Sequence, residues 1–298
     1  MITSVDFDYY GRLLVNGNKN GVIKLHIKND NDGSWSELKS FKGHDSTITS
    51  MNFCHPSFGK LLATSSIDRT IKIWDFKSNN GFNLIAKLVD NKSVLSKIEF
   101  SSSQNLLLYS ICSDGTFKIY QCTIPTDPTT WSIMHHLHLP IENKNNVDND
   151  NLTFTLSSCR DRRFSNYLSI ISGDTSIANI YTYSSINRPN VIGRLDAASS
   201  ITSISWAPNC DRPYHLIAVG LTDGYVKIFK VTLPNQLNDD QFKSECIAEL
   251  EHGGTVKSVD WNVIGTVLSS SSDDGKVIVW KSSYTGLWSN HSTYTVVE

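Results

Sequence analysis

The chain has 298 residues, with 27 Lys and Arg, 29 Asp and Glu, and 39% hydrophobic residues. That length allows two domains or one large all-β domain, and the near-neutral balance excludes capture of nucleic acid or anionic membrane by bulk charge. No apolar run approaches the roughly 18 to 20 residues of a transmembrane segment. Asp6, Asp8 and Arg12 interrupt the apolar stretch that a signal peptide would need. We therefore expect a soluble protein of the nucleus or cytosol.

The cysteines occur without any C-x-x-C pair, which argues against zinc ribbons and redox dithiols. We interpret them as small hydrophobic residues. Their even number leaves a disulfide framework as the alternative. They are Cys54, Cys112, Cys122, Cys159, Cys210 and Cys246.

A short pattern recurs six times along the chain, and it consists of small residues, a turn residue and a strand of alternating apolar positions. The turn residues are 46 to 61 positions apart, a period typical of propellers and solenoids. Asn and Asp tolerate the left-handed backbone region, so these copies predict β-hairpins. The turn residues are Asn20, Asp68, Asp114, Thr175, Asp223 and Asp274. Six positions after each turn residue come His26, Trp74, Tyr120, Tyr181, Phe229 and Trp280.

Another strand precedes each hairpin and a further one follows it, so every repeat has four predicted strands. The preceding strands are ITSVDF, ITSMNF, VLSKIEF, LTFTLSS, ITSISW and VKSVDW. Four-stranded units arranged radially form a β-propeller. The sequence therefore predicts one all-β, six-bladed propeller domain over 1–298, with a flexible polar loop at 141–151. The predicted blades are 1–42, 43–91, 92–140, 151–197, 198–251 and 252–298.

The two ends of the chain bear on how the ring closes. The first repeat begins at its innermost strand and the last ends in a possible outer strand at 287–297, so we expect no strand shared between them. An open ring leaves a seam that a partner covers by adding strands, and a ring that closes on itself is the alternative. The seam residues are predicted to be Val5, Phe7, Leu13, Val15, Ile23 and Leu25 from blade one, and Val259, Trp261, Leu268, Val277 and Val279 from blade six.

The repeats resemble the WD-repeat family, most clearly in FKGHDSTITSMNF and LLATSSIDRTIKIWD of the second copy and LEHGGTVKSVDW and LSSSSDDGKVIVW of the sixth. In that family a His, a Ser or Thr, the turn Asp and the final Trp form a structural hydrogen-bonded network. Blades three to five lack the His, so the network is incomplete there. The resemblance assigns the network to His44, Thr64, Asp68 and Trp74, and to His252, Ser270, Asp274 and Trp280.

Longer segments, including DFDYYGRLL, SISWAPNCDRPYHLIAVGLTDGYVKIFKVT and VKSVDWNVIGTVLSSSSDDGKVIVWKSSYTGLW, resemble the WD-repeat nucleoporins that are close homologues of the COPII coat protein Sec-thirteen. The resemblance implies a scaffold subunit at the nuclear pore, whose open propeller receives a blade from an α-solenoid nucleoporin of the Y-shaped complex. It also implies a second location at the vacuole or lysosome, with a solenoid and propeller partner, in a coat-like complex of the SEA or GATOR type that regulates TOR signalling. A COPII coat subunit and a peptide-reading adaptor are the alternatives.

Two sets of residues invite a chemical interpretation. The Ser or Thr, His and Asp of the networks could be taken for a catalytic triad, but repeat-equivalent positions favour buried polar groups that satisfy one another. His135, His136 and His138 form a cluster in which His136 and His138 would share one face of a strand, as two metal ligands might. No third ligand stands at a recognisable spacing, which favours a polar outer strand of a blade. We expect no enzyme activity, cofactor, metal or direct contact with nucleic acid.

Overall fold

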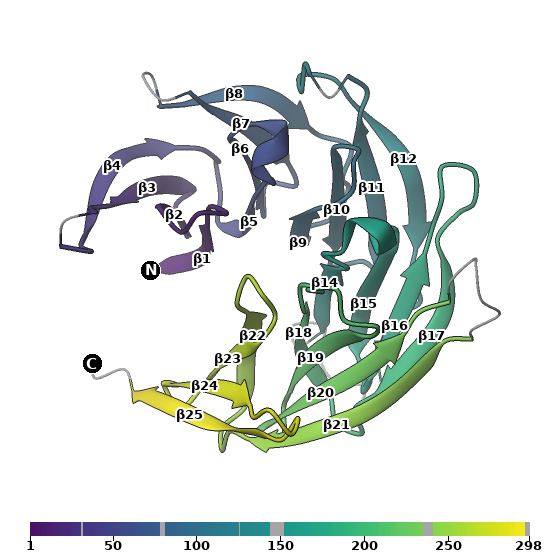
Figure 1. Ribbon diagram of the computed structural model, residues 1–298. Helices are drawn as coiled ribbons and strands as arrows, with labels where there is room; N and C mark the ends of the chain where they lie inside the picture. The colour runs from purple at the N-terminus through teal and green to yellow at the C-terminus, as the bar shows by residue number, and fades with distance from the viewer. Residues whose placement is uncertain (31, 78–80, 125, 144–151, 235–240, 296–298) are drawn as a thin grey trace. The chain divides into compact units, whose positions relative to one another are not determined.

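The computed structural model describes residues 1–30, 32–77, 81–124, 126–143, 152–234 and 241–295. Two compact units make up the chain, Met1–Leu139 and Pro140–Glu298. Each unit holds three mainly antiparallel sheets, and Figure 1 labels their strands apart from β13 (Glu142–Asn143). The described residues contain no α-helix, and so no helix there is long and apolar enough to cross a membrane.

The first unit contains blades one to three. Blade one is β1 (Ile2–Phe7), β2 (Leu13–Asn18), β3 (Val22–Lys28) and β4 (Trp35–Lys42). Blade two is β5 (Ile48–Phe53), β6 (Leu61–Ser66), β7 (Ile71–Lys77) and β8 (Gly81–Leu88), with the short 3-10 helix η1 (Pro56–Phe58) after β5. Blade three is β9 (Leu95–Phe100), β10 (Leu107–Cys112), β11 (Thr116–Cys122) and β12 (Trp131–His138).

The second unit contains blades four to six. Blade four is β14 (Thr153–Ser158), β15 (Tyr167–Asp174), β16 (Ile177–Thr182) and β17 (Asn190–Asp196), with the 3-10 helix η3 (Arg162–Phe164) after β14. Blade five is β18 (Ile201–Trp206), β19 (His215–Leu221), β20 (Tyr225–Thr232) and β21 (Lys243–Glu251). Blade six is β22 (Val256–Trp261), β23 (Val267–Ser272), β24 (Lys276–Ser282) and β25 (Trp288–Thr295).

Blade four carries one element that the repeat pattern did not predict. The two-residue strand β13 (Glu142–Asn143) pairs in parallel with β15, at Gly173 and Asp174. The predicted flexible loop at 141–151 is therefore partly a strand, and its remainder from 144 lies outside the described residues.

The sheet topology follows the sequence repeat. Every four-stranded blade uses consecutive strands, and among the described residues the first and last sheets share no strand. This confirms the predicted fold class, a six-bladed β-propeller without a closing strand.

Hydrogen bonds from turn side chains to the backbone explain why the middle hairpin forms in each repeat. An oxygen of the turn residue accepts the backbone N–H two positions later, as Asp68 does from Thr70 at 3.0 Å and Asp114 from Thr116 at 2.8 Å. In blade one Asn20 keeps the predicted turn position, two residues after the end of β2, and Asn18 Oδ1 accepts the N–H groups of Asn20 and Val22. Ser66 Oγ accepts the N–H of Asp68 in the same way in blade two, so the repeat is in register at its first turn.

The innermost strands are joined through polar side chains, which explains the Ser, Thr and Asp among their apolar residues. In unit 1, Asp6 Oδ2 accepts the backbone N–H of Phe53 at 2.6 Å. In unit 2, Ser157 Oγ accepts the N–H of Trp206, and Ser203 Oγ that of Val259, both at 2.9 Å. These bonds satisfy backbone donors where one blade meets the next.

All six cysteines are free, so the disulfide alternative is wrong. Four are buried, and burial raises the pKa of Cys54, Cys112 and Cys159 to about 12. Their thiols stay protonated at neutral pH and pack as small apolar groups.

Candidate partner-binding faces and structural networks

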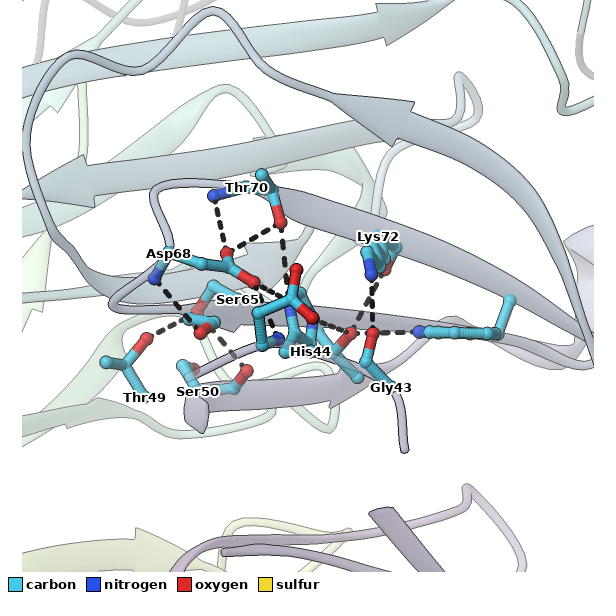
Figure 2. Close-up of polar contacts among 12 residues, drawn as sticks. Gly43, His44, Thr49, Ser50, Ser65, Asp68, Thr70 and Lys72 are labelled. Carbon is cyan, nitrogen blue, oxygen red and sulfur yellow. Dashed lines mark hydrogen bonds and ion pairs between the residues drawn. The ribbon is translucent and has the colours of Figure 1, made fainter. Parts of the chain in front are cut away.

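The polar network of blade two connects four buried or half-buried side chains (Figure 2). His44 Nδ1 lies 2.9 Å from Asp68 Oδ2, and His44 Nε2 lies 2.8 Å from Thr64 Oγ1. The indole N–H of Trp74 donates to the same Thr64 oxygen at 2.9 Å. One assignment satisfies every group: Trp74 donates to Thr64, Thr64 to His44, and the Nδ1–H of His44 to Asp68.

Burial lowers the pKa of His44, although Asp68 opposes the shift. Burial by itself would raise the pKa of Asp68, but hydrogen bonds from Thr70 and His44 outweigh it and bring that pKa to about 2. His44 is therefore neutral at pH 7, and its contact with Asp68 is a hydrogen bond to a carboxylate.

This arrangement does not suit nucleophilic catalysis. Thr64 has no exposed surface, and its oxygen already accepts the indole N–H of Trp74. A nucleophile must reach a substrate, so the network of blade two holds the fold together. Among the described residues no group of His, Cys, Asp and Glu is arranged to hold a metal ion.

The network predicted for blade six does not form in the same way. Trp280 Nε1 donates to Ser270 Oγ at 2.8 Å, but His252 contacts the backbone oxygen of Ser270, and its Nδ1 is buried without a partner. Asp274 bonds instead to Ser272 and to Lys276, whose Nζ lies 2.7 Å away. The hydrogen bond from Lys276 is the main reason that the pKa of Asp274 is far below its usual range.

A sequence difference next to the turn Asp explains why the two networks differ. The residue two positions after the turn Asp is Thr70 in blade two and Lys276 in blade six. Thr70 bonds one oxygen of Asp68 and leaves the other to His44. Lys276 is a cation that reaches solvent, and it takes the carboxylate oxygen that a histidine would need.

Blade three has a substitute network that the sequence reasoning missed. Asn91 precedes β9 by four positions, as His44 precedes β5. Its Oδ1 accepts a hydrogen bond from Tyr120 Oη at 3.2 Å. Asp114 accepts from Ser93 Oγ at 2.5 Å. The equal spacing before the first strand was the signal that could have identified Asn91.

Blade one presents a partly apolar face that does not pack on blade two. Opposite residues of antiparallel strands share a face, and the register pairs Phe7 with Leu14, and Leu14 with His26. Val5 is 49% exposed and Phe7 51%. The ring of Trp35 contacts that of Phe7 edge to face, with centroids 5.8 Å apart. We call Val5, Phe7, Leu14 and Trp35 the outer face of blade one.

Two polar pairs lie on the same side of this sheet. Asn16 Nδ2 lies 2.9 Å from His26 Nε2. Lys24 Nζ lies 2.8 Å from Glu37 Oε2 in a half-exposed ion pair. The outer face of blade one therefore combines aromatic and aliphatic contact area with fixed polar groups, a composition typical of protein interfaces.

Blade six has a smaller apolar set on the side away from blade five. Val277 pairs with Tyr294 in the sheet and Val279 with Ser292, so all four share that side. Val277 and Val279 are half-buried, and Tyr294 is 62% exposed. We call Val277, Val279 and Tyr294 the outer face of blade six.

The remaining predicted seam residues are buried between neighbouring blades and face away from these surfaces. Leu13, Val15, Ile23 and Leu25 pack into one core with residues of blade two. Val259, Trp261 and Leu268 pack with residues of blade five. Strand alternation is the reason: Val5 lies opposite Asn16, so the neighbouring Val15 points to the other side of the sheet.

Comparisons with known proteins agree with this architecture. The family described as "WD domain, G-beta repeat" matches residues 35–75 and 244–281. Nucleoporin seh1 of Schizosaccharomyces pombe is 30% identical over 313 residues, covering 97% of this chain and 91% of that protein. Nucleoporin SEH1 of Saccharomyces cerevisiae is 29% identical, covering 95% and 93%. Nucleoporin SEH1 of Homo sapiens is 25% identical, covering 97% and 83%.

A solved structure shares the fold. A chain from "Crystal Structure of Mitotic Checkpoint Complex" superimposes with a TM-score of 0.67 at 17% identity, over 94% of this chain and 74% of that one. That likeness supports the propeller architecture alone.

Proposed function

Because the chain belongs to the SEH1 family of nucleoporins, we propose that it is a non-enzymatic scaffold subunit of the Y-shaped outer-ring complex of the nuclear pore. An α-solenoid nucleoporin donates a blade that packs on the propeller, and the assembly supports nucleocytoplasmic transport. The observation that carries the proposal is the outer face of blade one, where Val5 and Phe7 are half-exposed on a terminal blade.

The outer face of blade one suits a donated blade better than a small ligand. Phe7 and Trp35 are aromatic anchors already packed on each other, so little side-chain entropy is lost when a partner covers them. The hydrogen bond between Asn16 and His26 holds both side chains in place, which adds polar groups of fixed position to this face. An obligate interface of this kind buries more than roughly 2,000 Å² and resists salt.

The outer face of blade six contributes less apolar area. Val277, Val279 and Tyr294 share it with the small polar residues Ser269 and Ser271. Small side chains let another sheet approach closely, so this face is suited to backbone contact with donated strands.

The proposal includes a second location. The same outer faces bind a solenoid and propeller subunit of the SEA or GATOR type of coat-like complex at the vacuole or lysosome membrane, which regulates TOR signalling. One propeller serves two complexes if both partners donate a blade of similar chemistry. Each partner then excludes the other from the same copy of the chain.

The test is purification of the tagged chain from native cells in high salt, followed by mass spectrometry. We expect a stoichiometric α-solenoid nucleoporin and, in a separate pool, vacuolar coat-like subunits. Phe7→Asp places a charge on the outer face of blade one and should release both partners. Val279→Asp tests the outer face of blade six in the same way.

Tyr10→Asp is the matched control, because Tyr10 is an exposed aromatic residue of unit 1 that lies on the β1–β2 loop, outside the outer face. It should keep both partners. Retention of the partners by both face variants contradicts the proposal. Recovery of COPII coat subunits would identify the chain as a COPII coat subunit instead. Recovery of no stable partner would favour a peptide-reading adaptor.

A further inference from the structure

Unit 2 carries large apolar side chains on loops where no packing requires them. Val263 is 63% exposed and Ile264 53%, both on the β22–β23 loop. Tyr284 is 103% exposed and Leu287 73%, both on the β24–β25 loop. The two loops lie at the same end of the blade six sheet, because β22 and β24 run in the same direction. Such a concentration of apolar tips marks an interaction site.

The corresponding loops of neighbouring blades join this end of the unit. Cys210 Sγ, from the β18–β19 loop, donates to the carbonyl oxygen of Ile264 at 3.4 Å. Arg212 Nη1, from the same loop, donates to the carbonyl oxygen of Gly265 at 3.0 Å. Arg163 Nη2, from the β14–β15 loop, lies 3.2 Å from Asp211 Oδ1. We call the described residues of the β14–β15, β16–β17, β18–β19, β22–β23 and β24–β25 loops the loop rim.

Charge is distributed unevenly between the two ends of unit 2. The loop rim contains five arginines, against only Asp161 and Asp211. The described loops at the opposite end contain three aspartates and no Lys or Arg. The β20–β21 loop, which carries Asp239 and Asp240 in the sequence, follows β20 at the rim end and lies largely outside the described residues. The rim arginines are Arg160, Arg162, Arg163, Arg188 and Arg212, and the opposite aspartates are Asp223, Asp273 and Asp274.

We propose that the loop rim of unit 2 docks on an anionic lipid surface. Exposed aliphatic and aromatic tips enter the boundary between headgroups and acyl chains, and Arg162 and Arg188 pair with lipid phosphates. The other rim arginines have protein partners: Arg160 and Arg163 form ion pairs with aspartates, and Arg212 donates to backbone carbonyl oxygens. Nucleic acid is the weaker candidate, because branched aliphatic tips such as Val263 and Ile264 offer no flat ring on which bases stack. The near-neutral overall charge does not reveal this surface, because Arg188 and Arg212 join the run from Arg160 to Arg163 only when the loops of different strands and blades meet.

Unit 1 provides an internal contrast. Tyr9 and Tyr10 are exposed on its β1–β2 loop. The loops at that end of unit 1 carry more acidic than basic residues: Asp8, Asp30, Asp32 and Asp127 against Arg12 and Lys60. Apolar tips in an acidic setting are repelled by anionic lipid. The proposal therefore predicts lipid binding through unit 2 alone.

The experiment is co-sedimentation of the full chain with phosphatidylcholine vesicles, with and without phosphatidylserine. We expect the chain to pellet only with the phosphatidylserine vesicles, and less so at high salt. The double variant Val263→Asp and Ile264→Asp should lower vesicle association at least about tenfold, since two apolar contacts are lost. Arg162→Gln should lower it by about fivefold through the loss of one cationic contact.

Thermal unfolding shows whether the double variant is folded. If it is not, Leu287→Asp tests the β24–β25 loop instead and should also lower vesicle association. Tyr10→Asp is the matched control and should leave vesicle association unchanged. Absence of the chain from the phosphatidylserine pellet overturns the proposal, as does equal loss for Tyr10→Asp and the rim variants. Binding to polyuridine RNA that depends on Arg162 but not on Ile264 assigns the surface to nucleic acid instead. Because none of these residues lies on the outer faces, loss of the solenoid partner and loss of lipid binding are separable.

Discussion

The rings of Phe7 and Trp35 meet edge to face on the outer face of blade one, with centroids 5.8 Å apart and planes at 62°. The pair connects the innermost strand β1 to the outermost strand β4 on the same side of one sheet. An aromatic pair fixed in this way is an anchor ready for a partner.

The first prediction separates interface residues from core residues in blade one. Phe7→Asp should change the free energy of unfolding by no more than about 1 kcal/mol, because the side chain is half-exposed. Leu25→Ala should cost about 2 to 5 kcal/mol, because Leu25 has no exposed surface and its loss leaves a cavity. Chemical denaturation of the isolated chain measures both. A larger loss for Phe7→Asp would place that residue in the core.

The second prediction concerns the two polar networks. Thr64→Val removes the partner of both Trp74 Nε1 and His44 Nε2 and should destabilise the fold by about 2 to 4 kcal/mol. Ser270→Ala removes only the partner of Trp280 Nε1 and should cost about 1 to 2 kcal/mol. Thermal unfolding of both variants gives the comparison. Equal losses of stability in the two variants would mean that the hydrogen bond between Thr64 and His44 does not stabilise the fold.

The third prediction is a loss of stability in acid. Burial lowers the pKa of His215 to about 4, so the folded state favours its neutral form and the unfolded state binds the proton more readily. The stabilisation is complete above pH of about 6.5 and is lost as pH falls toward 4, amounting to about 3 kcal/mol. Unfolding free energy measured across that range should fall less steeply in His215→Gln. His44, whose pKa is also lowered by burial, contributes to the slope that remains, as do carboxylates with lowered pKa values such as Asp68.

The fourth prediction compares two glycines with similar backbone geometry. Gly21 has φ of 74° and Gly11 has φ of 65°, so alanine is strained at both. A Cβ at Gly21 would lie 2.0 Å from the backbone oxygen of His44, whereas nothing lies within 4 Å at Gly11. Gly11→Ala should cost about 1 kcal/mol, and Gly21→Ala clearly more. Similar melting temperatures for the two variants would mean that the backbone at His44 yields freely.

The number of repeats and their four-strand content were predictable from the sequence. These features are local: Asp68 and Asp114 form their turns through bonds to N–H groups only two positions away. Turns formed by bonds at that range can be predicted from the residue sequence. The resemblance to the WD-repeat family placed His44, Thr64, Asp68 and Trp74 in one network, and the structure has hydrogen bonds among these four side chains.

The face that each residue joins and the oxygen that each polar group bonds depend on contacts that form only in the folded chain. Phe7 lies opposite Leu14, so Leu13 and Val15 turn to the core, and a register shift of one residue would exchange the two sets. Lys276 draws Asp274 away from His252, although the sequence motif is intact. The loop rim follows the same logic, because Arg163 and Asp211, 48 positions apart in the chain, meet only when blades four and five pack together. The order of the strands follows from local sequence signals. The face that each side chain joins, the partner of each polar group and the clustering of charges depend on strand register and on contacts between distant residues.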